Sequence, residues 1–174
     1  MVMHCRGKHL FAPLMRTMII ISYQHLQIIY NHGESAYPEE CCGLLLGYIQ
    51  EGKKTVVEVI PTKNAWQGEA ENFSGKSTDK AQGTPESQRR RYAIAPQTML
   101  QVQKQAREKS LEIIGIFHSH PDYPSIPSEF DRLYAWQGYS YVITSIHQGK
   151  RWDIHSWVLD DNQQFQEEII ENSL

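Results

Sequence analysis

Two histidines, a serine and an aspartate lie close together in the stretch HSHPDYPSIPSEFD, residues 118–131. His118 and His120 are two residues apart, a spacing that directs both side chains to the same face of a β-strand. Ser128 and Asp131 are three residues apart at an expected helix start, so they would share one helix face. Two imidazoles and one carboxylate suit a catalytic zinc site, because three protein ligands leave a fourth position open for water. The stretch therefore predicts a zinc site made by His118, His120 and Asp131.

A hydrolytic zinc site needs two further groups. Bound zinc lowers the pKa of its water to roughly 7, but a general base is still needed to move protons. Glu40 lies just before an apolar run and is the candidate for this base. A hydrogen-bond donor must also stabilise the oxyanion that develops during hydrolysis, and Ser128 is the candidate donor.

Each of these residues also has a simpler structural explanation. Ser128 and Asp131 fit a variant of the helix capping box. Histidines spaced as His118 and His120 are common on protein surfaces, and Glu40 alone fits a solvated loop carboxylate. The metal site explains all five residues together, and for this reason it is the favoured interpretation.

Two patterns in the chain resemble those of a known family. HSHP at 118–121, with seven residues between His120 and an S-x-x-D pattern, resembles the signature of the JAMM (MPN-domain) metalloproteases. The family also has an E-x-x-G pattern ahead of an apolar strand, and ECCG at 40–43 matches it. The similarity to small bacterial members covers most of residues 18–174. The main departure is the polar segment 67–91, which looks like an insertion.

This resemblance implies both a fold and a chemistry. The fold would be α/β: a single MPN (JAMM) domain with a central mixed β-sheet flanked by helices, similar to cytidine deaminases. His118, His120 and Asp131 would ligate one zinc ion, with a catalytic water as the fourth ligand. Glu40 would be the general acid and base, and Ser128 would help to stabilise the oxyanion. The substrate would be a peptide or isopeptide bond after the C-terminal Gly-Gly of a ubiquitin-like protein or a ThiS/MoaD-type sulfur carrier.

Two other functions are compatible with parts of this pattern. Some MPN domains are non-catalytic binding scaffolds, but those usually lack the ligands, whereas all five positions are filled here. A nucleoside or base deaminase is the other alternative. That chemistry calls for His-x-Glu followed by Pro-Cys-x-x-Cys, and the chain contains no such pair of motifs. The hydrolase interpretation is therefore preferred.

The elements that must position these residues alternate between strands and helices. Ser22 is expected to cap a helix that ends at Gly33, and Pro96 to begin a second one. A third helix is expected near 128–137, and the strands are expected at 18–22, 41–49, 55–60, 113–117, 139–146 and 152–159. The alternation predicts a central sheet with helices packed against it.

Composition limits the class of protein. A chain of 174 residues with 40% hydrophobic content is long enough for one domain with a proper core. Its net charge of −3 gives no sign of nucleic-acid binding, and no apolar run is long enough to span a membrane. Three cysteines form no disulfide framework and fit a cytoplasmic location. Cys41 and Cys42 are expected to be small buried hydrophobic residues.

Two segments are expected to lie outside the packed core. Residues 1–17 are basic, have no periodic apolar pattern and lack the features of a signal peptide, so we predict a disordered extension before a domain at 18–174. Residues 67–91 are rich in Gly, Ser, Gln and charge, and are predicted to be a flexible insertion. Arg89, Arg90 and Arg91 end this insertion. They are expected to form a solvated basic corner, with contact to an acidic partner as the alternative.

Overall fold

The computed structural model describes residues 17–66 and 88–173 of the chain. Nearly all of the predicted N-terminal extension, and residues 67–87 of the predicted insertion, lie outside these described residues. Within the described ranges, the elements in chain order are β1 (Met18–Ser22), α1 (Tyr23–Ala36), β2 (Cys42–Gln50), β3 (Lys53–Thr62), α2 (Pro96–Glu108), β4 (Glu112–Pro121), α3 (Glu129–Tyr134), β5 (Ser140–His147), β6 (Lys150–Leu159) and β7 (Phe165–Ser173).

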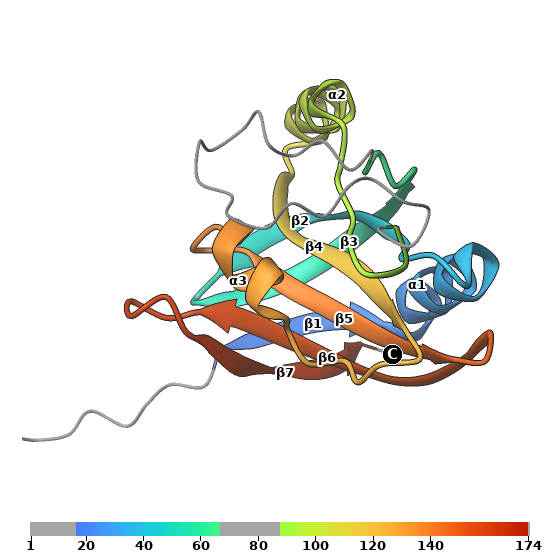
Figure 1. Cartoon of the computed structure of the whole chain (residues 1–174). Coiled ribbons are helices and arrows are strands. Elements are labelled where there is room, and N and C mark those ends of the chain that lie inside the picture. The colour runs from blue at the N-terminus through green and yellow to red at the C-terminus, as the bar shows by residue number, and fades with distance from the viewer. Residues whose placement is uncertain (1–16, 67–87, 174) are drawn as a thin grey trace, which may run out of the picture.

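The strands form one mixed sheet that closes into a barrel in the order β1-β3-β2-β4-β5-β6-β7 (Figure 1). β1 runs parallel to both β3 and β7, and β4 runs parallel to β5. The remaining neighbours are antiparallel. The predicted single domain with a mixed sheet flanked by helices is confirmed. Its closure is a further finding, because it depends on β7, which the sequence analysis does not predict.

The core lies on both faces of β2 and β4, which explains why these strands are continuous apolar runs. On one face, Leu45 and Ile114 pack with Leu26 and Ile29 of α1. On the other face, α2 covers the sheet, and its buried residues pack against Leu44, Leu46 and Ile113. Cys41 and Cys42 are buried free thiols, as predicted. Among the described residues, no helix combines the length and the apolar character needed to cross a bilayer.

Helix α1 begins where the sequence predicts it and ends later. The Ser22 side chain accepts a hydrogen bond from the His25 N–H at 3.2 Å, which confirms the predicted cap. The helix continues past Gly33 to Ala36, so the prediction of a stop at Gly33 is wrong. A Cβ atom at Gly33 would lie 2.9 Å from Ile146 Cδ1 of β5. The glycine therefore permits close packing of helix on sheet rather than ending the helix.

The sequence pattern does not predict strand β7, because the fully buried position of this strand holds a charged residue. The residue that it buries is Glu168, which is 2% exposed, while Ile169 on the other face is 39% exposed. Period-two patterns identify strands by apolar residues at the buried positions. A strand with a buried glutamate and an exposed isoleucine therefore gives the wrong signal.

Candidate metal centre

The two histidines lie on β4, in the interior of the sheet. β4 is longer than predicted and continues through the histidines to Pro121, with β2 on one side and β5 on the other. His118 is opposite Cys42 on β2 and Ile143 on β5. His118 is 0% exposed and His120 is 8% exposed. The two-residue spacing on a strand directs both rings to the same face, as the sequence analysis predicts.

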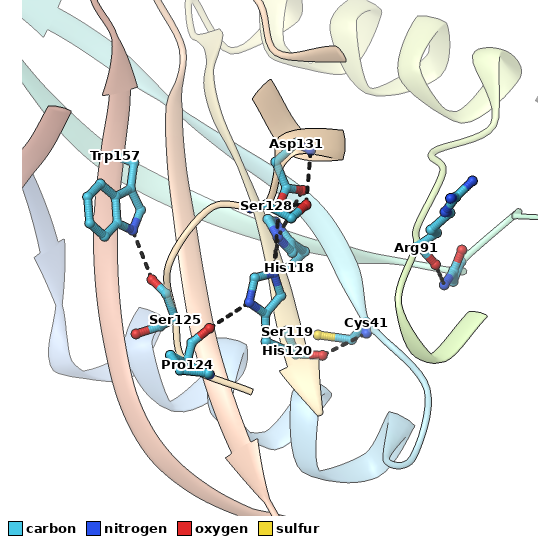
Figure 2. Close-up of polar contacts among 11 residues, drawn as sticks. Cys41, Arg91, His118, Ser119, His120, Pro124, Ser125, Ser128, Asp131 and Trp157 are labelled. Carbon is cyan, nitrogen blue, oxygen red and sulfur yellow. Dashed lines mark hydrogen bonds and ion pairs between the residues drawn. The ribbon is translucent and has the colours of Figure 1, made fainter. Parts of the chain in front are cut away.

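Asp131 completes a buried group of three donors with these histidines (Figure 2). The two Nε2 atoms are 3.1 Å apart. Asp131 Oδ1 is 3.3 Å from His118 Nε2, and Asp131 Oδ2 is 3.8 Å from His120 Nε2. Ligand atoms around a tetrahedral zinc ion with bonds of about 2.0–2.2 Å are roughly 3.3–3.6 Å apart. The spacing and the chemistry of the three donors therefore fit such an ion.

Hydrogen bonding and burial act differently on the two imidazoles. His120 Nδ1 lies 2.7 Å from the Pro124 carbonyl oxygen. A carbonyl only accepts, so Nδ1 carries a proton, and Nε2 is the ring nitrogen that faces His118 and Asp131. Burial lowers the pKa of His118 to about 4, which keeps its ring neutral. His118 therefore meets the requirement that a histidine ligand be uncharged. Burial alone would lower the pKa of His120 as well, but Asp131, Glu40 and the Pro124 carbonyl outweigh it and raise this pKa, so a metal ion that binds His120 would compete with a proton.

Ser128 positions the Asp131 carboxylate through the start of α3. Asp131 Oδ2 accepts hydrogen bonds from the Ser128 N–H at 2.7 Å and from the Ser128 hydroxyl at 2.6 Å. Ser128 Oγ in turn accepts from the Asp131 N–H at 3.2 Å, so the capping box is present. Burial alone would raise the pKa of Asp131, but His118, His120 and Ser128 outweigh it and hold this pKa below its usual range. The cap and the candidate ligand are thus one arrangement, in which the hydroxyl proton of Ser128 points to Asp131.

Glu40 lies buried next to this group. It is 6% exposed, whereas its neighbour Glu39 is exposed, so Glu40 is not a solvated loop carboxylate. Its N–H donates to the Gln88 carbonyl at 2.8 Å, and its carbonyl accepts from Asn64 Nδ2 at 3.0 Å. Burial raises the pKa of Glu40 to about 8, with electrostatic contributions from His120, Asp131 and Arg91. A carboxyl group that titrates near neutral pH can both accept and return a proton.

Arg91 and Tyr92, together with Trp66 and Phe130, form a wall of side chains beside the candidate metal centre. No sequence pattern predicts this wall. The Tyr92 ring stacks on the His118 ring, with centroids 4.5 Å apart and an interplanar angle of 25°. The Arg91 guanidinium lies 5.5 Å from the Trp66 ring and 4.8 Å from the Phe130 ring. No local motif marks these residues, because they meet the site through contacts distant in sequence.

The three arginines differ in their surroundings. Arg89 and Arg90 are exposed, as a solvated basic corner requires, but Arg91 is half-buried, so that interpretation is wrong for Arg91. Arg90 is also engaged: its Nη2 donates to the Tyr123 hydroxyl at 2.5 Å, and its guanidinium lies over the Tyr123 ring.

Asn64 connects the wall to the site. Its Nδ2 donates to the carbonyl oxygens of Glu40 and Arg91, each at 3.0 Å. Its Oδ1 accepts from the N–H groups of Trp66 at 3.0 Å and Ala93 at 3.2 Å. One side chain therefore uses both donors and its acceptor to hold three segments of backbone together.

A mixed barrel with two histidines on an inner strand, an aspartate at a helix start beside them and a buried glutamate is the arrangement of a JAB/MPN-class domain with a candidate metal site. A sequence model described as prokaryotic homologs of the JAB domain matches residues 22–160. This match covers most of the chain, and the protein belongs to that family.

Two distant relatives are both named desampylase. A desampylase of Haloferax volcanii is 26% identical over 125 residues, which are 71% of this chain and 73% of that protein. A desampylase of Pyrococcus furiosus is 26% identical over 78 residues, which are 44% of this chain and 52% of that protein.

Solved structures of similar proteins agree with the fold. The solution structure of a protein from Desulfitobacterium hafniense has a TM-score of 0.68 and 25% identity, and the match covers 90% of this chain and 95% of that one. The solution structure of a protein from Salinibacter ruber has a TM-score of 0.63 and 29% identity, covering 90% and 92% of the two chains.

Proposed function

We propose that the protein is a zinc-dependent metallopeptidase that hydrolyses the bond after the C-terminal Gly-Gly of a ubiquitin-like protein or a ThiS/MoaD-type sulfur carrier. The observation that carries the proposal is the convergence of His118, His120 and Asp131 within 4.8 Å of one another, beside the buried carboxyl of Glu40. The name of the distant relatives, desampylase, supports removal of a protein modifier as the type of reaction.

In this proposal each residue has a defined role. His118, His120 and Asp131 would hold one zinc ion, which would supply the Lewis acidity that makes water a nucleophile near neutral pH. Glu40 accepts a proton from the attacking water at its carboxylate and delivers it to the leaving amine. The pKa of about 8 that burial gives Glu40 falls when a cation binds nearby, because opposite charge favours the carboxylate. The base is therefore available at neutral pH.

Ser128 is proposed to stabilise the oxyanion of the substrate carbonyl. Its hydroxyl donates to Asp131 in the structure, so this role requires the hydroxyl proton to turn towards the substrate. A cytoplasmic location is part of the proposal and is supported by the free thiols of Cys41 and Cys42.

The test is mass spectrometry of a sulfur carrier extended beyond its Gly-Gly and incubated with zinc-loaded protein. We expect cleavage after Gly-Gly that is lost on chelation. Glu40→Gln is expected to bind zinc as the parent does, because Glu40 is not a ligand, and to lower the rate by roughly 10²–10⁴-fold, because the proton carrier is removed.

Other outcomes would overturn parts of the proposal. Stoichiometric zinc binding without cleavage of any carrier would favour the alternative, a non-catalytic MPN-type scaffold. Full activity in Glu40→Gln would reject Glu40 as the general base.

A further inference from the structure

Arg91 presents a cation whose edge is free among the described residues. Its guanidinium lies 5.5 Å from the centroid of the Trp66 ring and 4.8 Å from that of the Phe130 ring, and these two rings meet edge to face with centroids 5.4 Å apart. A cation attracted to aromatic rings does not use its N–H donors as conventional hydrogen bonds do, so they stay available to a further partner. Within residues 17–66 and 88–173, no carboxylate lies within 4.0 Å of this side chain, and no hydrogen bond from its guanidinium is found. Arg90 differs, because its guanidinium already donates to Tyr123.

This cation is close to the proposed reacting centre. Arg91 precedes Tyr92, whose ring stacks on His118, and it contacts Phe130, the neighbour of Asp131. Its charge also acts on Glu40, whose carboxyl is proposed to protonate the leaving amine. We therefore take the group of the substrate that pairs with Arg91 to be close to the scissile amide.

The chemistry of the proposed substrate limits what that group is. The two glycines before the bond carry no side chain. When a single amino acid is joined to Gly-Gly, its α-carboxylate lies on the carbon bonded to the scissile nitrogen. When a lysine side chain is joined by an isopeptide bond, no carboxylate lies so close.

We propose that Arg91 binds the free α-carboxylate of the leaving amino acid, so that the enzyme prefers carriers extended by one residue over isopeptide conjugates. This inference rests on the proposed function and narrows its substrate class. A guanidinium can pair with a carboxylate through two parallel hydrogen bonds, which give both affinity and orientation, and the contacts of Arg91 with Trp66 and Phe130 hold it beside the site.

The test compares two peptides that end in Gly-Gly-Ala, one with a free carboxylate and one with a C-terminal amide. Binding to the zinc-loaded Glu40→Gln protein is measured by calorimetry, so that turnover does not interfere. We expect the free acid to bind roughly 10–100-fold more tightly than the amide, as for a charge-assisted hydrogen bond. Arg91→Met in the same background is expected to abolish this preference.

Two further variants separate recognition from structural damage. Arg91→Lys keeps the charge but not the planar edge, and it is expected to retain a reduced preference for the acid. Arg90→Met is the matched control, because its hydrogen bond is already used, and it is expected to keep the full preference. Circular dichroism checks that each variant is folded. If Arg91→Met does not fold, the ratio of the two affinities is measured with Arg91→Lys instead.

The outcomes distinguish this inference from the proposed function. Equal affinity for acid and amide in the parent, or an unchanged ratio in both Arg91 variants, would overturn the role of Arg91. Cleavage of both peptides at equal rates by the wild-type protein would retain the hydrolase and reject the carboxylate site. An Arg91-dependent preference without cleavage in the wild-type protein would retain the carboxylate site and reject the hydrolase.

Discussion

The Ser128 hydroxyl and backbone together fix the orientation of the Asp131 carboxylate. Both hydrogen bonds from Ser128 go to Oδ2, at 2.7 and 2.6 Å, while Oδ1 is left 3.3 Å from His118 Nε2. A ligand whose neighbours hold it in place loses less freedom when a metal binds. Such supporting groups commonly contribute 10–100-fold to metal affinity.

We therefore predict that Ser128→Ala weakens zinc binding by roughly 10–100-fold and also destabilises the protein by about 1 kcal/mol through loss of the α3 cap. Competition with a chromophoric chelator measures the affinity, and thermal unfolding measures the stability. Ser128→Thr keeps a hydroxyl and is expected to retain most of the zinc affinity and most of the stability. An unchanged zinc affinity in Ser128→Ala would contradict the positioning role of Ser128.

The three candidate ligands could be predicted from the sequence because they lie close together along the chain. His118, His120 and Asp131 lie within fourteen residues of one another, and strand and helix periodicity is enough to bring them together. Their role as zinc ligands stays a prediction. Tyr92 and Asn64 could not be found in this way, because their contacts with the site depend on how distant segments pack.

At the scale of elements, Asn64, two residues after the end of β3, connects the segments around the site. Asn64 joins the backbone at Glu40, Trp66 and residues 91–93 through four hydrogen bonds. These segments carry the proposed base and the wall against His118. Loss of the side chain would leave several part-buried backbone groups without partners.

We predict that Asn64→Ala lowers the free energy of unfolding by roughly 1–3 kcal/mol and reduces hydrolysis more than zinc affinity, because the wall moves while the ligands stay. Urea denaturation, zinc titration and kinetics measure the three quantities. Asn31→Ala, at an exposed position of α1, serves as the control and is expected to change stability by less than about 0.5 kcal/mol. An equal effect in the two variants would reject this role of Asn64.

The sequence predicts those helices and strands whose buried faces are apolar. β2, β4, β5 and β6 and the starts of α1 and α2 follow the expected patterns, whereas β7 and the end of α1 do not. In β7 the buried position holds Glu168, and in α1 the glycine serves packing against Ile146. Both failures have one physical origin. Sequence patterns report where a residue type is usually found, whereas here tertiary contacts place a glutamate in the interior and a glycine within a helix.

At the scale of the whole molecule, Glu168 belongs to a buried polar network inside the barrel. Lys54 Nζ lies 3.9 Å from Glu168 Oε1 and donates to Ser140 Oγ at 2.8 Å. Glu168 Oε2 accepts from Ser156 Oγ at 2.7 Å. Because β3 and β5 are not neighbours in the sheet, the contact between Lys54 and Ser140 crosses the interior of the barrel. Burial lowers the pKa of Lys54, and Glu168 opposes this effect.

We predict that Lys54→Met lowers the free energy of unfolding by roughly 3–5 kcal/mol, since it leaves Glu168 as an uncompensated buried charge. The double variant with Lys54→Met and Glu168→Leu is expected to be more stable than Lys54→Met alone. Urea denaturation of both single variants and the double variant measures the coupling. The exposed neighbour Lys53 provides the control, and a loss in Lys54→Met no greater than in Lys53→Met would contradict the prediction.

The pairing of β1 with β7 has a consequence for how the protein acquires its structure. It joins Met18 to Ile169, near opposite ends of the described chain, and so the barrel closes only after the last strand has formed. Contacts between residues so distant in sequence slow folding, because a long loop must be ordered first. We expect an open-sheet intermediate during synthesis on the ribosome, with β1 unprotected in pulsed hydrogen exchange until β7 emerges. Protection of the β1 amides before β7 has formed would contradict this expectation and would show that pairing with β3 is enough to order β1.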